Sequence, residues 1–265
     1  MSLVINTINT VNSMENCNIQ YEKKLTIYNV FHSKIFPELY SEMNEEDKQY
    51  ITFYGVKTKE NTEMNIIYEN SLNVYNQSYQ RNWYNEASAL YHIYMNMLYK
   101  KSQFIGLCQY DMKFSNTTIP NILSDIDEKT IYVYWFFPWW FLGGQKIIVK
   151  NLNVFKCGLK SYNDFFNTNY TEETVIKNRM ITCNTFVISS KLFEKMMSWM
   201  IQYYVNDELE QSYFEHESNC TYNAGNIIEA LVGMFFALEV EQGYKYGDFS
   251  VAHDTPERLY KNQCL

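Results

Sequence analysis

Few features of this chain mark a boundary between domains. Its 265 residues include only 4 prolines and 9 glycines, and they contain no internal repeat and no low-complexity linker. Apolar residues make up 46% of the chain, which is enough to build a substantial core. We therefore expect one compact domain and exclude a chain that is disordered as a whole.

Cysteine is sparse and lacks the spacing of a metal cluster. The six cysteines lie far apart and no C-x-x-C sequence occurs, which argues against a zinc cluster. The N-terminus lacks the basic-then-apolar run of a signal peptide. Together these absences predict a reducing, cytoplasmic setting.

Positive charge is also in short supply. Lys and Arg number 22 against 30 Asp and Glu, which gives a net charge of −8 and a pI near 5.1. This balance argues against a nucleic-acid-binding protein that relies on neutralising phosphates. An acidic protein can still bind a nucleotide locally through a divalent metal ion, so a nucleotide ligand stays open.

No hydrophobic run is long enough to cross a membrane. The longest, residues 131–142, spans twelve residues and is interrupted by Pro138, whereas a membrane helix needs about 20. One interpretation is a buried strand followed by an aromatic loop. The alternative is that Trp139, Trp140 and Phe141 form an exposed patch for a sugar acceptor, a lipid interface or a second subunit in a homo-oligomer.

Aromatic residues, by contrast, are abundant. The chain has 24 Tyr and 17 Phe. Together with the many asparagines, this favours the compositional bias of an AT-rich genome. A carbohydrate-binding surface built from aromatic side chains is the competing interpretation.

The order of apolar segments predicts an α/β fold with a mainly parallel, Rossmann-like mixed sheet flanked by helices. Strands are expected at residues 25–31, 50–54, 64–68, 104–108, 131–137, 146–149 and 181–188. Helices are expected at 34–45, after Trp83, within a polar stretch at 156–180, at 191–204 and at 226–241. Residues 1–22 are predicted to form a tail or an extra edge element, and residues 23–265 the single domain.

The strand at 104–108 ends abruptly in the polar residues Gln109, Tyr110 and Asp111. In open α/β sheets ligands bind just outside the carboxyl ends of strands. A carboxylate one or two residues past such a strand is well placed to hold a metal or a charged cofactor. We therefore expect the chemistry near Asp111. The sequence Asp125-Ile126-Asp127 instead precedes its strand and is interpreted as a solvated turn.

Five segments, in this order, resemble the bacterial capsular and exopolysaccharide glycosyltransferases, a family that also has members in large DNA viruses. The segments are IYNVFHSK at 27–34, WYNEASALYHIYMN at 83–96, FIGLCQYDMKF at 104–114, NTFVISSKLF at 184–193 and GNIIEAL at 225–231. The resemblance covers residues 25–240 and implies a GT-A-like domain. The chain could be one of the viral members, in which case the cytoplasm would be that of the host.

Two departures from the family pattern limit what can be carried over. The family's His-Tyr-Arg-Arg reads Gln109-Tyr110-Asp111-Met112 here, and the arginine after the helix glutamate is Ala230. The Gln-x-Asp sequence stands where the GT-A fold usually has Asp-x-Asp, a motif that binds Mn²⁺ or Mg²⁺. The resemblance therefore implies that Asp111 contacts a metal ion.

The resemblance also implies roles for other residues. His253 could return to the metal from the C-terminal segment, and Glu229, a carboxylate in an otherwise apolar helix, could be the catalytic base. The alternatives are a strand-end aspartate that caps a turn for Asp111, a surface histidine for His253, and a paired or edge-facing carboxylate for Glu229. The residues expected to bind the donor are Val30, Phe31, His32, Asn85, Glu86, Gln109, Tyr110 and Asn184. For Glu86 and Asn85, helix capping is the alternative.

The function that follows is sugar transfer from a nucleotide diphosphate donor to a glycan hydroxyl, in polysaccharide or glycoprotein glycan synthesis, with Mn²⁺ or Mg²⁺. The competing hypothesis is a non-catalytic descendant of the same fold that binds glycans or acts as a scaffold. The changed arginine motif and the aromatic residues near Trp139 favour that second hypothesis.

Overall fold

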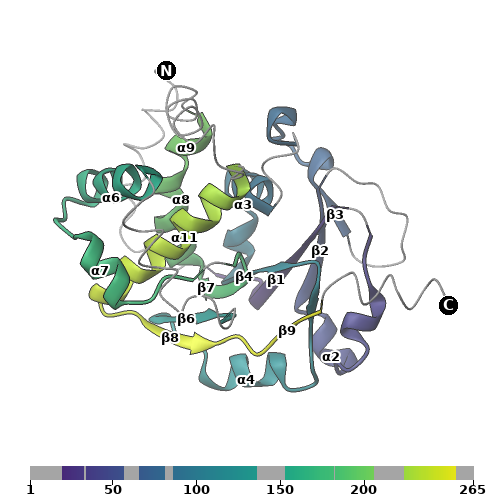
Figure 1. Ribbon diagram of the computed structural model, residues 1–265. Coiled ribbons are helices and arrows are strands. Elements are labelled where there is room, and N and C mark those ends of the chain that lie inside the picture. Colours follow the sequence, from purple (N-terminus) through teal and green to yellow (C-terminus); the bar gives the residue numbers. More distant parts are fainter. Residues whose placement is uncertain are drawn as a thin grey trace.

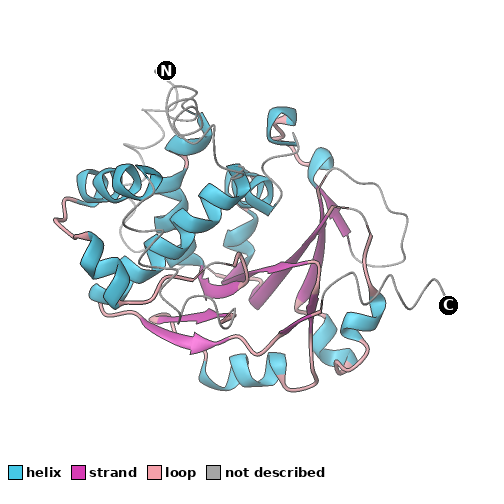
Figure 2. Ribbon diagram, in the orientation of Figure 1, coloured by secondary structure: helices cyan, strands magenta, loops and turns pink. Residues whose placement is uncertain are grey.

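The computed structural model describes residues 20–32, 34–56, 66–80, 86–135, 153–181, 183–205 and 224–254. These residues form a central sheet with helices packed against both of its faces (Figure 1). The helices gather mainly on one side, and a smaller group covers the other (Figure 2). The predicted α/β class with a mainly parallel sheet is confirmed.

Among the described residues, the large sheet has seven strands in the order β3-β2-β1-β4-β7-β6-β8. All run parallel except β7, which is antiparallel to both of its neighbours. Their bounds are β1 (Lys23–Phe31), β2 (Ile51–Gly55), β3 (Ile66–Tyr68), β4 (Ser102–Gln109), β6 (Thr130–Val133), β7 (Phe186–Ser189) and β8 (Lys245–Asp248). A small second sheet pairs β5 (Met112–Lys113) with β9 (Ala252–His253).

The central strands read as continuous apolar runs because both of their faces are buried. In β4, Ile105 and Leu107 contribute to the core on one face, while Phe104 and Cys108 contribute to the core on the other. Successive side chains of a strand point to opposite faces, so one strand serves both cores.

The larger core lies under α3 (Glu86–Met95), α6 (Asn153–Phe166), α7 (Glu172–Lys177), α8 (Ser190–Met200) and α11 (Ala224–Glu241), with α9 (Gln202–Val205) following α8. The opposite face is covered by α4 (Thr118–Asp125) and a 3₁₀ turn at Pro37–Tyr40, with the short α2 (Glu45–Lys48) nearby. Ser189 is the N-cap of α8, since its side chain accepts a hydrogen bond from the backbone N–H of Leu192 at 3.2 Å.

Three predicted elements differ from the structure, and one of them is the strand expected at 131–137, which ends at Val133 although residues 134–135 are described. The helix expected at 34–45 is replaced by the turn at 37–40 and by α2, because the Leu39 carbonyl accepts a hydrogen bond from Phe114 N–H at 2.9 Å and is not available to continue a helix. The strand expected at 181–188 begins only at Phe186. The helix α4 and the strands β5, β8 and β9 were not predicted. The strand expected at 146–149 and the predicted patch of Trp139, Trp140 and Phe141 lie outside the described residues.

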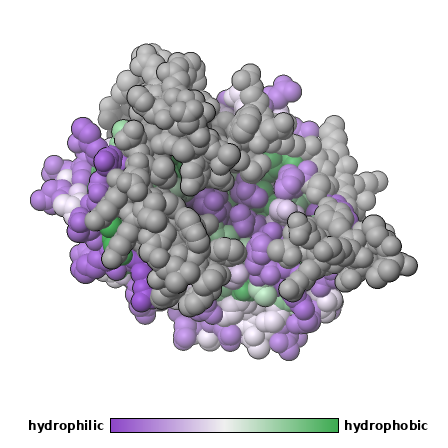
Figure 3. Space-filling view, in the orientation of Figure 1, coloured by the Kyte–Doolittle hydropathy of each residue, from purple (hydrophilic) through white to green (hydrophobic). Residues whose placement is uncertain are grey.

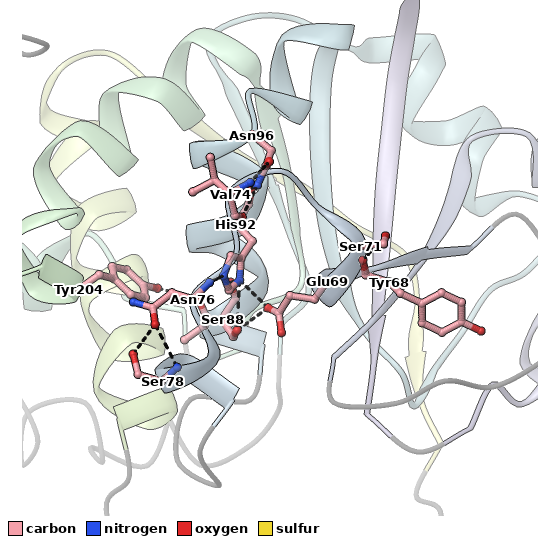
Figure 4. Close-up of polar contacts among 11 residues, drawn as sticks. Tyr68, Glu69, Ser71, Val74, Asn76, Ser78, Ser88, His92, Asn96 and Tyr204 are labelled. Carbon is pink, nitrogen blue, oxygen red and sulfur yellow. Dashed lines mark hydrogen bonds and ion pairs between the residues drawn. The ribbon is translucent and has the colours of Figure 1, made fainter.

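A buried polar cluster attaches the segment before α3 to that helix (Figure 4). His92 Nδ1 lies 2.7 Å from Glu69 Oε1, the Ser88 hydroxyl donates to the same oxygen, and Asn76 N–H donates to His92 Nε2 at 2.9 Å. Glu69, Ser88 and His92 are fully buried. Because both ring nitrogens of His92 are engaged, we interpret the cluster as structural, and it fixes the helix that begins at Glu86.

Across the described residues, none of the helices is both long enough and apolar enough to span a bilayer.

Candidate active site

The carboxyl ends of the parallel strands and the start of β7 meet at one edge of the large sheet. β1 and β4 are parallel with Val30 opposite Gln109, and β7 runs the other way, so its first residues lie beside the last residues of β4. In the space-filling view of Figure 3, which has the orientation of Figure 1, hydrophilic residues gather near the middle of the molecule. This edge is where an open α/β sheet binds ligands.

Asp111 lies between β4 and β5, and β9 pairs with β5 so that Met112 is opposite His253. This pairing brings His253 Nε2 to 2.9 Å from Asp111 Oδ2, and Asp254 N–H donates to the Asp111 carbonyl at 2.9 Å. The other carboxylate oxygen, Oδ1, is buried and has no hydrogen-bond partner among the described residues. The two residues expected at a metal thus lie together.

Burial raises the pKa of Asp111, while His253 and His32 act in the opposite direction. A divalent cation would favour the charged carboxylate in the same way as these histidines. At 2.9 Å, Asp111 Oδ2 and His253 Nε2 contact each other directly, so a cation held by both would replace the proton between them. The unpartnered Oδ1 would be available to the same cation.

The described residues contain no group of three His, Cys, Asp or Glu side chains that could hold a metal ion. Mg²⁺ is commonly bound by one or two carboxylates together with waters and substrate phosphates. Asp111 with His253 could therefore hold a cation whose remaining ligands come from a phosphate group and from water.

His32 and Tyr110 lie near Asp111. Their rings meet edge to face with centroids 4.8 Å apart, and the Phe36 ring lies tilted at 6.3 Å from the ring of Tyr110. His32 is exposed, whereas the side chains of Val30 and Phe31 are buried in the two cores. Both residues were predicted to bind the donor, but their side chains are not accessible to a ligand. They pack the sheet that positions His32.

The end of β4 is tied to the loop before β7. Gln109 N–H donates to the Thr185 hydroxyl at 3.3 Å, and the Cys183 thiol donates to Gln109 Oε1 at 2.9 Å. The Thr185 carbonyl accepts from Tyr134 N–H at 3.1 Å. The bond from Tyr134 continues the register of β6 with β7 by one residue, whereas Gln109 N–H bonds a side-chain hydroxyl and not a backbone carbonyl of this loop. The side-chain oxygen of Gln109 is occupied.

Asn184 connects this loop to α11. Its backbone N–H donates to Glu229 Oε1 at 3.2 Å. Its side chain is buried, and its Oδ1 has no hydrogen-bond partner among the described residues. Burial, and then the nearby negative charge of Glu86, raise the pKa of Glu229 to about 8. Glu86 at the start of α3 therefore lies close enough to influence Glu229, and Asn85 lies outside the described residues.

One glycine sets the approach of α11 to this loop. A Cβ atom at Gly233 would lie 2.0 Å from the Ile181 carbonyl oxygen. Gly233 is four residues after Glu229, so the two share a face of the helix. Sequence reasoning missed Gly233, Thr185 and Cys183. The E-x-x-x-G spacing in an apolar helix was the one available signal, and nothing in the sequence indicates the backbone bonds of Thr185.

The Asp125–Asp127 segment, predicted to be a solvated turn, instead contains the last residue of α4 and the two residues that connect α4 to the turn before β6. Asp127 Oδ1 accepts from Lys129 N–H at 2.7 Å, and Asp127 Oδ2 lies 3.2 Å from Lys245 Nζ. Asp125 is exposed at the end of α4.

Comparison with known proteins gives little further information. No family model and no curated protein matches the chain. A solved structure described as the apo form of WbbM, a bifunctional glycosyltransferase, is similar with a TM-score of 0.47 and 15% identity. The match covers 88% of this chain and 46% of that chain. At these values the function has to be argued from the side chains of the site.

Proposed function

We propose that this protein is a metal-dependent glycosyltransferase that moves a sugar from a nucleotide diphosphate donor to a glycan hydroxyl. The observation that carries the proposal is the buried Asp111, whose Oδ1 lacks a partner among the described residues while its Oδ2 pairs with His253. A buried acceptor without a donor is unfavourable, and a bound cation would compensate for it. The resemblance of the surrounding segments to glycosyltransferases supplies the reaction class.

Asp111 and His253 would hold Mn²⁺ or Mg²⁺, which supplies the charge that stabilises a departing diphosphate. His32 and Tyr110 would flank the base and ribose of the donor, because their edge-to-face pair lies next to Asp111. Gln109 would contribute less than the sequence suggests, since its side-chain oxygen already accepts from Cys183. Asn85 and Glu86 remain predicted donor contacts.

Glu229 is proposed as the base if the reaction inverts the anomeric centre. The acceptor oxygen would form the new bond to the anomeric carbon and give its proton to Glu229. The bond from that carbon to the donor phosphate oxygen would break, and the diphosphate would leave with the electron pair. A pKa of about 8 would suit a base that works near neutral pH.

A non-catalytic glycan-binding or scaffold protein is the second candidate. The change of the family's His-Tyr-Arg-Arg to Gln-Tyr-Asp-Met at residues 109–112 favours it. In that case a glycan would bind equally well in the presence of EDTA, and no donor would be hydrolysed or transferred.

The first experiment is a thermal-shift measurement with UDP, GDP, CDP and dTDP, each with and without MnCl₂. We expect at least one nucleotide to raise the Tm only when Mn²⁺ is present, because a ligand that binds the folded state stabilises it. Asp111→Asn should abolish the Mn²⁺-dependent part of the shift.

The matched control is Asp125→Asn, the same chemical change at an exposed aspartate that follows no strand of the sheet. It should leave the shift as in the wild type. No shift with any nucleotide, or an equal shift in Asp111→Asn, would contradict metal-assisted donor binding and leave the glycan-binding candidate.

A further inference from the structure

Two acceptor oxygens of the site, Asp111 Oδ1 and Asn184 Oδ1, are buried without a hydrogen-bond donor among the described residues. The hydroxyls of Tyr40 and Tyr54 in the two cores are also buried without such a partner, whereas a buried carboxylate elsewhere in the protein is fully bonded. This carboxylate, Glu239, is buried with the Lys195 ammonium 2.7 Å from each carboxylate oxygen and with the Tyr162 hydroxyl donating at 2.7 Å. Buried acceptors are normally satisfied, so an oxygen left open at a site indicates a ligand group.

The two oxygens belong to different parts of the site. The polar contacts of Asp111 run to His253 and Asp254 on the C-terminal strand. Asn184 instead binds Glu229 on α11 through its backbone N–H. A ligand group next to Asn184 therefore lies next to the proposed base, on the side of the incoming hydroxyl.

Contacts on both sides of Asn184 hold it in place. The residues on either side of it are tied to the end of β4, through Cys183 and Thr185, and Thr185 is also bonded to Tyr134 after β6. The close approach of Gly233 to the Ile181 carbonyl keeps α11 against the same loop. The Asn184 backbone and the Glu229 carboxyl are thus held together on a rigid support.

We infer that Asn184 is a specificity-determining residue of the acceptor subsite, whose Oδ1 accepts a hydrogen bond from a hydroxyl adjacent to the one that faces Glu229. This inference rests on the proposed function. Neighbouring hydroxyls of a sugar ring lie close together, and the residues Asn184 and Glu229 are hydrogen-bonded to each other, so one sugar could contact both. The acceptor class is therefore a sugar with a free vicinal diol. The role differs from the donor contact that the sequence suggested for Asn184.

The test is Asn184→Ala, which keeps the backbone N–H that binds Glu229. Transfer is measured as release of the nucleoside diphosphate identified by thermal shift, from its sugar conjugates, with a panel of methyl glycosides as acceptors. Each glycoside is compared with its deoxy analogue at the position next to the reacting hydroxyl.

We expect the variant to lose at least tenfold in kcat/KM for the acceptor, mainly through KM, and to discriminate less between a glycoside and its deoxy analogue. Its Mn²⁺-dependent nucleotide shift should equal that of the wild type. Without ligand, its Tm should be equal to or above that of the wild type, because an unsatisfied buried acceptor has been removed. A purely structural role would lower the Tm instead.

The control is Asn121→Ala, at an exposed asparagine of α4, which should change none of these values. Loss of the nucleotide shift in Asn184→Ala would place the residue on the donor side and overturn the inference while the proposed function stands. Unchanged acceptor kinetics, or a Tm lowered by several degrees, would overturn it as well. A wild type with neither nucleotide shift nor transfer would refute the proposed function, and this inference with it.

Discussion

At the scale of single residues, Glu229 makes the stability of the protein depend on pH. Its folded pKa of about 8 lies above the ordinary value of 4.5 because burial and Glu86 disfavour the charged form. Between these two values the unfolded chain has released the proton while the folded protein keeps it. Stability contributed by this group is therefore present below pH 4.5 and is lost as the pH rises toward 8, by up to about 1.4 kcal/mol per pH unit.

Glu229→Gln should remove this dependence, because the amide does not titrate and still offers an oxygen to Asn184 N–H. In urea unfolding between pH 5 and pH 8, the variant should gain stability relative to the wild type as the pH rises. Glu173→Gln, at an exposed glutamate of α7, should follow the wild type. Parallel curves for wild type and Glu229→Gln would show that the Glu229 carboxyl titrates as it does in the unfolded chain.

For single residues, the sequence allowed some members of the site to be predicted, but not their partners. Asp111 was predicted because it follows an apolar strand, and strand ends are visible in the apolar pattern. The contact of Glu229 with Asn184 was not, because the donor is a backbone N–H that every residue except proline carries. Side-chain chemistry could be predicted at these positions, but the partner of each group depends on how distant segments pack.

At the scale of elements, α11 can pack on the loop before β7 because the residue at the contact, Gly233, has no side chain. At Gly233 a Cβ would meet a backbone carbonyl, which cannot rotate away. Gly233→Ala should therefore displace the helix and destabilise the protein by about 1–3 kcal/mol in urea unfolding. The same shift would separate Glu229 from Asn184.

Gly158→Ala in α6 is the matched control. There a new Cβ would meet the ends of the Leu231 and Met234 side chains, which can adopt other rotamers. Alanine also favours the helix by about 1 kcal/mol over glycine. Gly158→Ala should thus lie within about 1 kcal/mol of the wild type. Equal losses in both variants would mean that the tight contact at Gly233 does not position the helix.

Elements also differ in how well their sequence predicts them. The helices at 191–204 and 226–241 were expected from long apolar patterns, and the structure has them as α8 with α9 and as α11. β9 has two residues and β8 has four partly exposed ones. Such strands carry no readable alternation, and they form because β6 and β5 offer backbone groups to pair with.

At the scale of the whole molecule, the site is assembled from both ends of the described chain. His32 comes from the exit of β1, Asp111 from the exit of β4, and His253 from β9, the last strand. The mainly parallel sheet was predictable, since strands buried on both faces read as apolar runs. That β7 is antiparallel and brings Asn184 to the same edge as Asp111 was not predictable, because apolar runs carry no direction.

This arrangement predicts that the C-terminal strand is needed for the ligand response but not for the fold. A chain ending at Phe249 keeps the large sheet and the bond from Phe249 N–H to the Val133 carbonyl at 2.9 Å. It loses His253 and the bond from Asp254 to Asp111. We expect an unchanged far-UV circular dichroism spectrum and one cooperative thermal transition, but no Mn²⁺-dependent nucleotide shift.

A chain ending at Asp254 is the control, because it retains β9 and its pairing with β5. It should keep the shift, which would assign the loss to residues 250–254 and not to the residues beyond them. His253→Ala in the full chain should reduce the shift in the same direction, since Asp111 would then be the remaining protein ligand of the pair. A full shift in the chain ending at Phe249 would mean that Asp111 binds the metal–nucleotide complex without help from β9, and the pairing of Asp111 with His253 would then serve only to hold the strand.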